Sequence, residues 1–322
     1  MTPASPPVPA DTSASPAWRR PLRALDAWLR APGPATRLAA LRILVGAFAT
    51  VYLAIRFVHL ISFVDFPTRS FDPVGVVWLV GAPLPAPPVI ALAALSLPLA
   101  LAYTLGWRFA ATGPLFAAVL LWVLSYRNSW GMIFHTDNLM VLHVIVLGLS
   151  RAADAWSLDA RAGRTRDDPA DPSTATVHGW PVRLLAVVTV TSYLIAGVAK
   201  VRLSGLGWIS SDLLRNYVAY DNLRKLELGD WYSPLGARLV AHAWLFPPLA
   251  AASLVLELGA PLALAGPRLA RVWAAGAWAF HLGVLALMAI FFPYPLFGLA
   301  FAPLFAVERL PLWRWLGLAR GP

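Results

Sequence analysis

The stretch Thr191-Ser-Tyr-Leu-Ile-Ala-Gly-Val-Ala-Lys-Val-Arg-Leu-Ser-Gly-Leu-Gly-Trp208 decides the fold class and poses the main functional question. It has the pattern of an apolar helix that presents Lys200 where a membrane surface should begin. An ammonium group at that position must find a partner, reach water or lose its proton, and an amine without that proton is a base. The question is therefore whether Lys200 is a catalytic base or a helix-end anchor.

Composition places the chain in a membrane. Of its 322 residues, 59% are hydrophobic and 13% are charged, which leaves too little polar surface to cover a soluble core. Apolar runs near the length of a bilayer crossing recur along the chain. The sequence therefore predicts an all-α, polytopic integral membrane bundle of about eight helices. These spans are predicted at residues 38–61, 88–106, 109–127, 138–153, 181–203, 239–265, 271–292 and 295–311.

The arginines predict the orientation of the bundle. With eight spans, the arginine-rich connections all fall on one side, which the positive-inside rule makes cytoplasmic, so both termini are predicted to be cytoplasmic. Because the net charge of +10 comes mostly from arginines at helix ends and in short loops, the expected partner is the lipid bilayer and not nucleic acid. The predicted parts are a disordered N-terminus with a basic amphipathic segment (1–37), the transmembrane domain (38–311) with an external cap (204–238), and a cytoplasmic tail (312–322).

Lys200 closes the fifth predicted span at its outer end. Gly197 and Ala196 lie on the same helix face, three and four residues earlier, and such a small face lets a neighbouring helix or a flat ring approach closely. Tyr193 lies on the same stripe and is placed to hydrogen-bond a ligand. Packing against apolar surface would favour the neutral amine. From spacing alone, an ordinary anchor at the helix end is the favoured alternative.

Other ionisable residues in the spans are candidates because a bilayer makes them costly. Arg56, near the outer end of the first span, is placed either to stabilise an anion or to reach the membrane surface. The segment His135-Thr-Asp-Asn138 brings together an imidazole suited to proton transfer, a carboxylate and an amide, although the last two also suit a helix N-cap. No second histidine follows at helical spacing, so no metal site is predicted.

Three more ionisable residues lie along the spans. Glu257 is about 25 Å from the outer end of a continuous sixth span and is expected to lie too deep to pair with Lys200. His281, near the middle of the seventh span, is placed to reach Glu257 or a buried ligand. A polar clamp between helices explains these two residues as well as a functional role does. Arg42, near the inner end of the first span, is expected to reach lipid phosphates.

Several motifs in order resemble a known family. Tyr193-Leu-Ile-Ala-Gly-Val-Ala-Lys200, with Trp208 following, resembles the segment around the catalytic lysine of vitamin K-dependent gamma-carboxylase and of the related bacterial HTTM (horizontally transferred transmembrane) proteins. The other matching motifs are Arg42-Ile-Leu-Val-Gly46, His135-Thr-Asp-Asn138, and Phe280-His281 followed by Phe291-Phe-Pro-Tyr294. Their order and spacing agree with the family from about residue 38 to 305.

The resemblance implies a quinol-dependent enzyme of the bacterial plasma membrane, either a gamma-carboxylase-like lyase or an oxidase. Lys200 would be the base and His135 its polar partner. The implied cofactor is a reduced naphthoquinone, menaquinol or vitamin K hydroquinone, with Arg56, Tyr193, Gly197, Trp208 and His281 as its binding residues. The chain reads Ala199-Lys200 where the enzyme has paired lysines, and no large lumenal domain is recognised, so the resemblance supports quinol chemistry more directly than carboxylation of protein glutamate.

The main alternative is a non-enzymatic membrane protein, an accessory or immunity factor for an exported peptide. In that hypothesis the cap at 204–238 contacts the partner and Lys200 is replaceable. The enzyme hypothesis instead predicts a lipid-accessible cavity beside Lys200, open to a small lipophilic substrate. A transporter is the weakest alternative, because no convincing repeat accompanies the polar residues of the spans.

Overall fold

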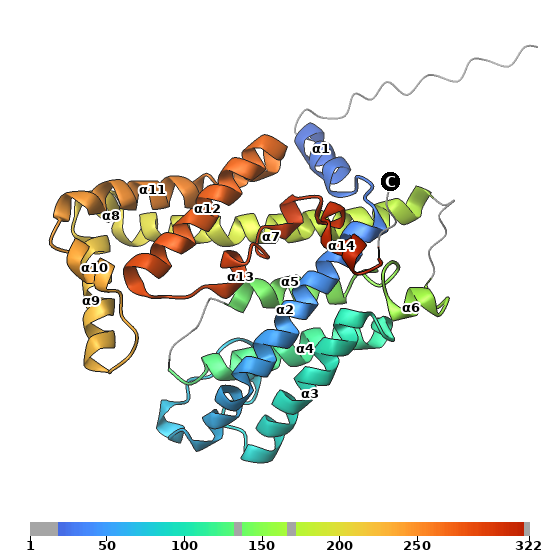
Figure 1. The fold of residues 1–322 in the computed structure, drawn as a ribbon, viewed down its shortest axis with the longest axis horizontal. Coiled ribbons are helices and arrows are strands. Elements are labelled where there is room, and N and C mark those ends of the chain that lie inside the picture. The colour runs from blue at the N-terminus through green and yellow to red at the C-terminus, as the bar shows by residue number, and fades with distance from the viewer. Residues whose placement is uncertain (1–18, 132–136, 166–171, 319–322) are drawn as a thin grey trace, which may run out of the picture.

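The computed structural model describes residues 19–131, 137–165 and 172–318, and the regular structure within these ranges is entirely helical. The prediction of an all-α fold is therefore confirmed. Figure 1 shows α2 to α5 on one side of the molecule and α7 to α13 on the other. The α-helices are α1 (Arg19–Leu29), α2 (Ala35–Ile61), α3 (Ala86–Leu105), α4 (Phe109–Asn128), α5 (Asn138–Gly148), α6 (Leu158–Arg161), α7 (Pro172–Ser204), α8 (Gly207–Ser210), α9 (Leu213–Glu227), α10 (Pro234–Leu239), α11 (Phe246–Leu258), α12 (Pro267–Met288), α13 (Pro293–Leu296) and α14 (Leu312–Trp315).

Within the described residues, five helices are long and apolar enough to cross a bilayer, which makes this a multi-pass membrane protein. They are α2 with the turn that follows it, α3, α4, α7 and α12. Two predicted spans are represented by shorter apolar helices, α5 and the segment Ala243–Leu258. At 1.5 Å per residue, α5 is about 16 Å long, roughly half the thickness of the hydrocarbon core. The prediction of eight spans is thus matched by five full-length helices and two short ones.

The last predicted span, 295–311, is not a continuous helix. After α13 the described chain makes short turns, including the 3₁₀ turns Ala302–Leu304 and Val307–Arg309. Gly298 has φ +77°, and proline at positions 293, 295, 303 and 311 removes backbone donors, so a single helix cannot form here. The middle of the segment, residues 300–303, is nevertheless buried in the protein, which is the environment in which non-helical backbone is tolerated at membrane depth.

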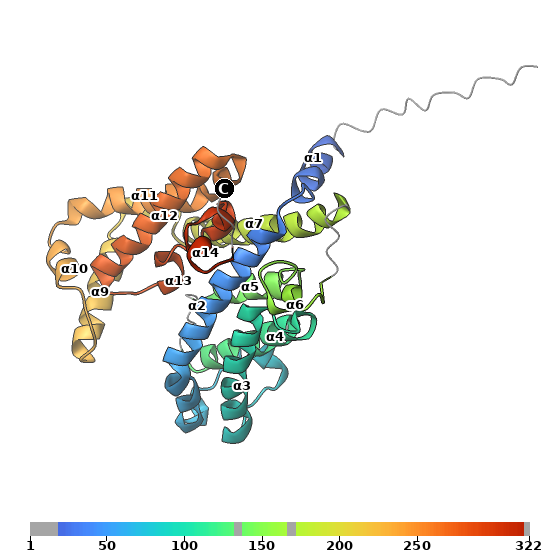
Figure 2. The ribbon, with the colours of Figure 1, turned by 45° about the vertical axis from the view of Figure 1, so that its right-hand side comes forward.

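Small residues bring the membrane helices together. A Cβ atom at Gly46 of α2 would lie 2.5 Å from the Thr104 hydroxyl oxygen of α3, and Figure 2 shows these two helices side by side. Gly113 of α4 and Gly148 of α5 face each other, since a Cβ on either would lie 2.6 Å from the carbonyl oxygen of the other. Association in a membrane depends on such close packing. Buried side chains from both halves form one continuous core.

Arg42 does not reach lipid phosphates, contrary to the prediction. Its side chain is fully buried, and its guanidinium group donates hydrogen bonds to the carbonyl oxygens of Ala152 (2.8 Å) and Trp156 (2.5 Å), in the loop after α5. The short α5 ends before a full crossing, so free carbonyl groups at its C-terminal side come within reach of α2. Arg42 therefore ties the first membrane helix to this loop.

The two ends of the described chain lie at the same end of the bundle. Arg37, at the start of α2, forms two hydrogen bonds with the Glu308 carboxylate, at 2.8 and 2.9 Å. Figure 1 places α1, α14 and the N-terminal part of α7 around this point. This arrangement agrees with termini on one side of the membrane, and the cytoplasmic assignment of that side remains a prediction.

Asp159 of the short helix α6, outside the membrane helices, joins this helix to the start of α4. The Asp159 carboxylate accepts hydrogen bonds from the backbone N–H groups of Arg108 (2.9 Å) and Phe109 (2.7 Å) and pairs with Arg164 at 2.8 Å. Burial alone would raise the pKa of Asp159, but these hydrogen bonds and the arginine outweigh it, so that the pKa lies below its usual value of 3.8. The carboxylate therefore stabilises the start of α4 when it is ionised.

We expect Asp159→Asn to lower the free energy of unfolding by about 1–2 kcal/mol near pH 7. A lowered pKa in the folded state contributes stability above the unfolded pKa, and that contribution is lost as the pH falls through the folded pKa. The difference between wild type and variant should therefore be constant above about pH 5 and shrink below about pH 4. Unfolding in detergent micelles across this range measures it, and a difference that grows with acidity would contradict the assignment.

Candidate functional site

The Lys200 side chain forms an ion pair between two helices. It lies four residues before the end of α7, and its Nζ donates a hydrogen bond to Oε1 of Glu257 in α11 at 2.5 Å. The Lys200 side chain is 21% exposed and the Glu257 side chain only 4%. The lysine is therefore neither an exposed anchor nor an isolated amine, and the carboxylate is a part of the site.

The prediction that Glu257 lies too deep to pair with Lys200 was wrong. It assumed one continuous helix from residue 239, whereas α11 begins at Phe246, which brings Glu257 about 10 Å closer to the outer end. The two helices also run antiparallel, because α8, which follows α7, contacts Ser253 in the middle of α11, while Gly197 packs beside the end of α11. Side chains lean toward the N-terminus of their own helix, so Lys200 and Glu257 lean toward each other.

Gly197 admits a helix and not a ring. A Cβ atom at this position would lie 2.9 Å from Cβ of Glu257 and 3.1 Å from the backbone nitrogen of Leu258. Gly197 lines neither of the cavities described below. The sequence left open whether a neighbouring helix or a flat ring packs on this small face. In the structure α11 packs there, so Gly197 serves helix packing, and the prediction that it contacts a cofactor is corrected.

Two cavities meet at Lys200. The larger, of about 540 Å³, is almost wholly apolar and lies between α8, α9, α11 and α12. The smaller, of about 330 Å³, lies between α7, α12 and the α13 segment. Both volumes fall in the range typical of small-molecule sites. Lys200, Phe280 and Val284 line both cavities. The remaining polar or ionisable side chains of the smaller cavity are Ser192, Tyr193, Glu257, His281 and Tyr294.

Aromatic rings surround the Lys200 amine. Its Nζ lies 4.9 Å from the centroid of the Trp208 ring and 5.7 Å from that of Phe280, distances at which a cation and a ring face attract each other. The Trp208 indole is held in place because its N–H donates to the Ser253 hydroxyl at 3.1 Å. The rings and Glu257 together stabilise the ammonium form of Lys200.

Tyr193 and His281 lie beside this pair, as their positions in the sequence suggested. A hydrogen bond of 2.7 Å joins the Tyr193 hydroxyl group to Nε2 of His281, and both side chains are buried at the wall of the smaller cavity. Further into the core, His143 bridges the Tyr294 hydroxyl (2.7 Å) and the Thr189 hydroxyl (3.1 Å). The smaller cavity is thus bounded by hydrogen-bonded polar side chains from three helices and the α13 segment.

One predicted site residue, Arg56, is not brought to Lys200. Arg56 is exposed on α2 and lines neither cavity. His135 lies outside the described residues. Its neighbour Asp137 is buried, accepts a hydrogen bond from the Tyr52 hydroxyl at 2.7 Å and forms an ion pair with Arg127 of α4. This carboxylate therefore ties α5 to α2 and α4.

Sequence reasoning missed the pairing of Glu257, although the cost of a carboxylate in an apolar helix singled that residue out. It also passed over the scarcity of lysine. Of the 26 lysine and arginine residues of the chain, only Lys200 and Lys225 are lysines. Arginine cannot lose its proton in a protein, whereas lysine can. Lys200 lines the larger cavity, and Lys225 lies in α9, a helix that forms one wall of this cavity.

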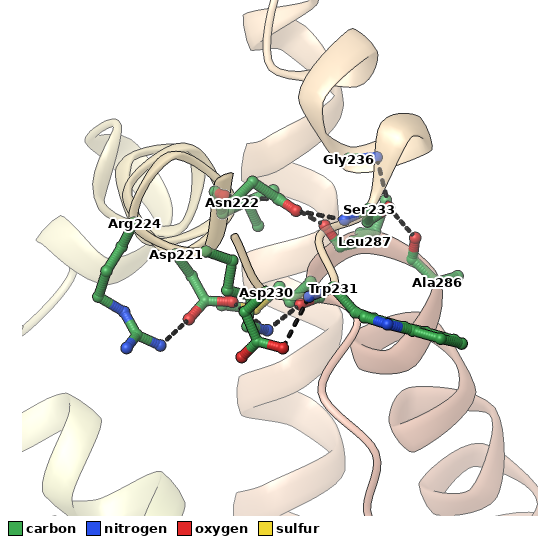
Figure 3. A network of polar contacts seen from close by, with 12 residues as sticks. Asp221, Asn222, Arg224, Asp230, Trp231, Ser233, Gly236, Ala286 and Leu287 are labelled. Atoms are coloured by element: carbon green, nitrogen blue, oxygen red, sulfur yellow. Dashed lines mark hydrogen bonds and ion pairs between the residues drawn. The ribbon is translucent and has the colours of Figure 1, made fainter. Parts of the chain in front are cut away.

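The cap, residues 204–238, is fastened to the C-terminal end of α12 (Figure 3). Three consecutive carbonyl groups at that end, which lack partners within the helix, accept hydrogen bonds from cap side chains. The pairs are Ser233 Oγ to Ala286 O (2.5 Å), Asn222 Nδ2 to Leu287 O (2.8 Å) and Lys225 Nζ to Met288 O (2.5 Å). Asn222 also accepts from the backbone N–H of Ser233 at 2.7 Å. Because α9 lines the larger cavity with Leu214, Tyr217 and Val218, this attachment closes one of its walls.

Comparison with known families agrees with this architecture. The family model of the HTTM domain matches residues 31–309, from just before α2 to the last turns of the buried C-terminal segment. The chain belongs to the HTTM family. The match includes Lys200, Glu257 and every residue that lines the two cavities. No curated protein and no solved structure matches the chain. The HTTM domain therefore contains the whole candidate site.

Proposed function

We propose that this HTTM protein is a membrane enzyme that removes a proton from a reduced naphthoquinone, menaquinol or vitamin K hydroquinone. The observation that carries the proposal is the position of Lys200, whose largely buried amine lies between an apolar cavity and a second, mostly apolar cavity that has several polar side chains. A lipid-soluble ring compound can reach such a site from the bilayer without crossing water. A gamma-carboxylase-like lyase and an oxidase both begin with this proton transfer.

The residues present fit such a cofactor. The larger cavity combines about 540 Å³ of apolar space with the flat faces of Trp208 and Phe280. The few polar groups needed to orient a ring hydroxyl are supplied at one end by Lys200 and Ser253. A reduced naphthoquinone supplies, when bound, an acidic hydroxyl group and two electrons for reaction with dioxygen. The apolar walls exclude water, which strengthens every electrostatic interaction at the amine.

The chain's own residues then have distinct roles in the proposal. Lys200 exchanges a proton with the ring hydroxyl group and stabilises the anion that remains. Trp208 and Phe280 hold the ring against the amine, and the Tyr193–His281 pair fixes the opposite wall of the smaller cavity. The cap supplies one wall of the larger cavity through α9.

Lys200→Ala is expected to lower the rate of hydroquinone oxidation at least 100-fold, because proton transfer by a positioned side chain contributes about 10²–10⁴ in rate. Lys200→Arg should be as inactive, since a guanidinium group does not release its proton. The measurement is consumption of reduced menaquinone and of dioxygen by purified protein in lipid nanodiscs. Arg202→Ala, which removes an exposed positive charge two residues away on the same helix, is the matched control and should keep full activity.

A second candidate is the non-enzymatic accessory or immunity protein for an exported peptide. The favouring observation is the surface of the cap and the turn after it, where Tyr220, Trp231 and Trp244 are exposed by 68%, 87% and 72%. Large exposed aromatic side chains are common at protein interfaces and at membrane surfaces. No hydroquinone consumption by the wild-type protein, or the same rate in Lys200→Ala, would favour this candidate over the enzyme.

A further inference from the structure

We infer that Glu257 is the proton acceptor of the site: Lys200 gives one of its own protons to the Glu257 carboxylate and takes the proton of a ligand hydroxyl group in its place, so that it remains an ammonium group facing the ligand anion. This inference rests on the proposed function, because it concerns the same transfer of a proton from the ligand. It also changes the role of the lysine, which relays positive charge between ligand and carboxylate and is not the final acceptor.

The two oxygen atoms of the Glu257 carboxylate are in different environments. Glu257 Oε1 accepts the hydrogen bond from Lys200, whereas Oε2 is buried and has no hydrogen-bond partner among the described residues. A buried carboxylate with an unsatisfied oxygen is costly, and protonation lowers that cost because it removes the negative charge. Glu257 is also the only acidic residue that lines either cavity in the described part of the chain. The site thus has a single carboxylate, and it is poised to take up a proton.

The Lys200 ammonium group must release a proton before it can accept one. An ammonium group has no lone pair, so Lys200 cannot accept a proton while it is paired as a cation with Glu257. The faces of Trp208 and Phe280 favour the cation before and after the transfer. The hydrogen bond of 2.5 Å gives the proton a direct path from nitrogen to oxygen. Transfer along it turns the pair into an amine and a carboxylic acid with no net change in charge.

The complete step balances. An Nζ–H bond of Lys200 breaks and an O–H bond forms at Glu257 Oε1. The free amine then takes the proton of the ligand hydroxyl group, whose O–H bond breaks while its electron pair stays on oxygen. Lys200 has regained its positive charge, Glu257 is neutral, and the ligand is an anion held by the ammonium group. No oxidant or reductant is needed for this step.

Four other titratable side chains line the cavities around the pair. Tyr193 comes from α7, His281 from α12, Tyr294 from α13 and Tyr217 from α9. The tyrosines are weaker acceptors than a carboxylate at neutral pH. His281 is the competing acceptor, because an imidazole can take up a proton near neutral pH. Its Nε2 is hydrogen-bonded to the Tyr193 hydroxyl group, and the test below includes it.

The test uses 2-naphthol, a bicyclic aromatic alcohol that partitions into membranes and needs no redox partner, with the full chain in lipid nanodiscs. The ultraviolet absorption of the probe reports whether it is bound as naphthol or naphtholate. Infrared difference spectra report the carbonyl stretch of a protonated carboxyl group. Wild type should ionise the bound probe near pH 7 and gain this band, which should shift when the protein carries ¹³C-labelled glutamate. Ionisation of the probe without a carboxyl band that responds to the label would place the proton on His281 and overturn the inference.

Glu257→Gln should bind the probe as neutral naphthol and gain no carboxyl band, while Glu257→Asp should restore both signals at least in part. A merely structural role of Glu257 would leave the ionisation of the probe unchanged in any variant that elutes as a monodisperse protein. Ionisation that persists in Glu257→Gln but disappears in Lys200→Met would overturn the inference and leave the proposed function standing. No ionisation in the wild type would overturn both.

Discussion

Replacing Glu257 with alanine is expected to lower the free energy of unfolding by about 3 kcal/mol. The substitution leaves the Lys200 ammonium group without the carboxylate that lies 2.5 Å away, and breaking a buried pair at one partner costs about 3–5 kcal/mol. The value should lie at the lower end of that range, because 21% of the lysine side chain is exposed. Reversible unfolding in mixed micelles of detergent and sodium dodecyl sulfate measures the change.

The control is the double variant Lys200→Met, Glu257→Leu. Apolar residues of similar volume remove both charges together, so its stability should return to within about 1 kcal/mol of wild type or exceed it. The two single variants and the double variant form a thermodynamic cycle that isolates the energy of the pair. A Glu257→Ala protein as stable as wild type, or a double variant as unstable as the single one, would show that the two side chains are not coupled.

Gly236→Ala is expected to detach the cap from α12 and to cost about 3 kcal/mol. A Cβ atom at Gly236 would lie 1.8 Å from the carbonyl oxygen of Leu287, which is backbone and cannot rotate away. Overpacking of this kind typically costs 1–3 kcal/mol, and the displaced α10 would also weaken the bond from Gly236 N–H to Ser233 Oγ. Local opening should therefore expose α9 to trypsin at Arg224 and Lys225 well below the temperature of global unfolding.

Gly207→Ala is the matched control, because it makes the same change within the cap at a position where no heavy atom lies within 4 Å of the added Cβ. It should keep the cap closed and be neutral or slightly stabilising, since alanine favours a helix more than glycine does. If Gly236→Ala is cleaved no faster than Gly207→Ala, the cap is not held by its contact with α12. The detached cap of Gly236→Ala should also weaken binding of 2-naphthol, because α9 forms a wall of the larger cavity.

The pattern of apolar residues predicted the long helices well. It placed the first span at 38–61 and the fifth at 181–203, and the structure has α2 at Ala35–Ile61 and α7 at Pro172–Ser204. Hydropathy failed where prolines interrupt an apolar run, as in 295–311, because it counts the side chains and ignores the missing backbone donors. It also merged α11 and its flanking turns into one span, and that error placed Glu257 at the wrong depth.

The candidate site was likewise predicted only in part from the sequence. Lys200, Tyr193, Trp208 and His281 do lie around two adjoining cavities. Helical spacing explains this for Tyr193 and Lys200, which share one face of α7. Their chemical roles and the quinone remain predictions. Contacts between elements far apart in the sequence were not predictable from spacing, and the clearest example is the pairing of Lys200 with Glu257.

The sequence by itself determined that this chain is a helical membrane protein and that Lys200 lies near the end of an apolar helix, because composition and local periodicity are properties of neighbouring residues. Only the tertiary structure decided what that lysine meets. The start of α11, the missing side chain of Gly197 and the antiparallel lean of the two helices together bring Glu257 within 2.5 Å of Nζ. A residue that reads as an anchor or an isolated base is, in the folded protein, one half of a buried pair.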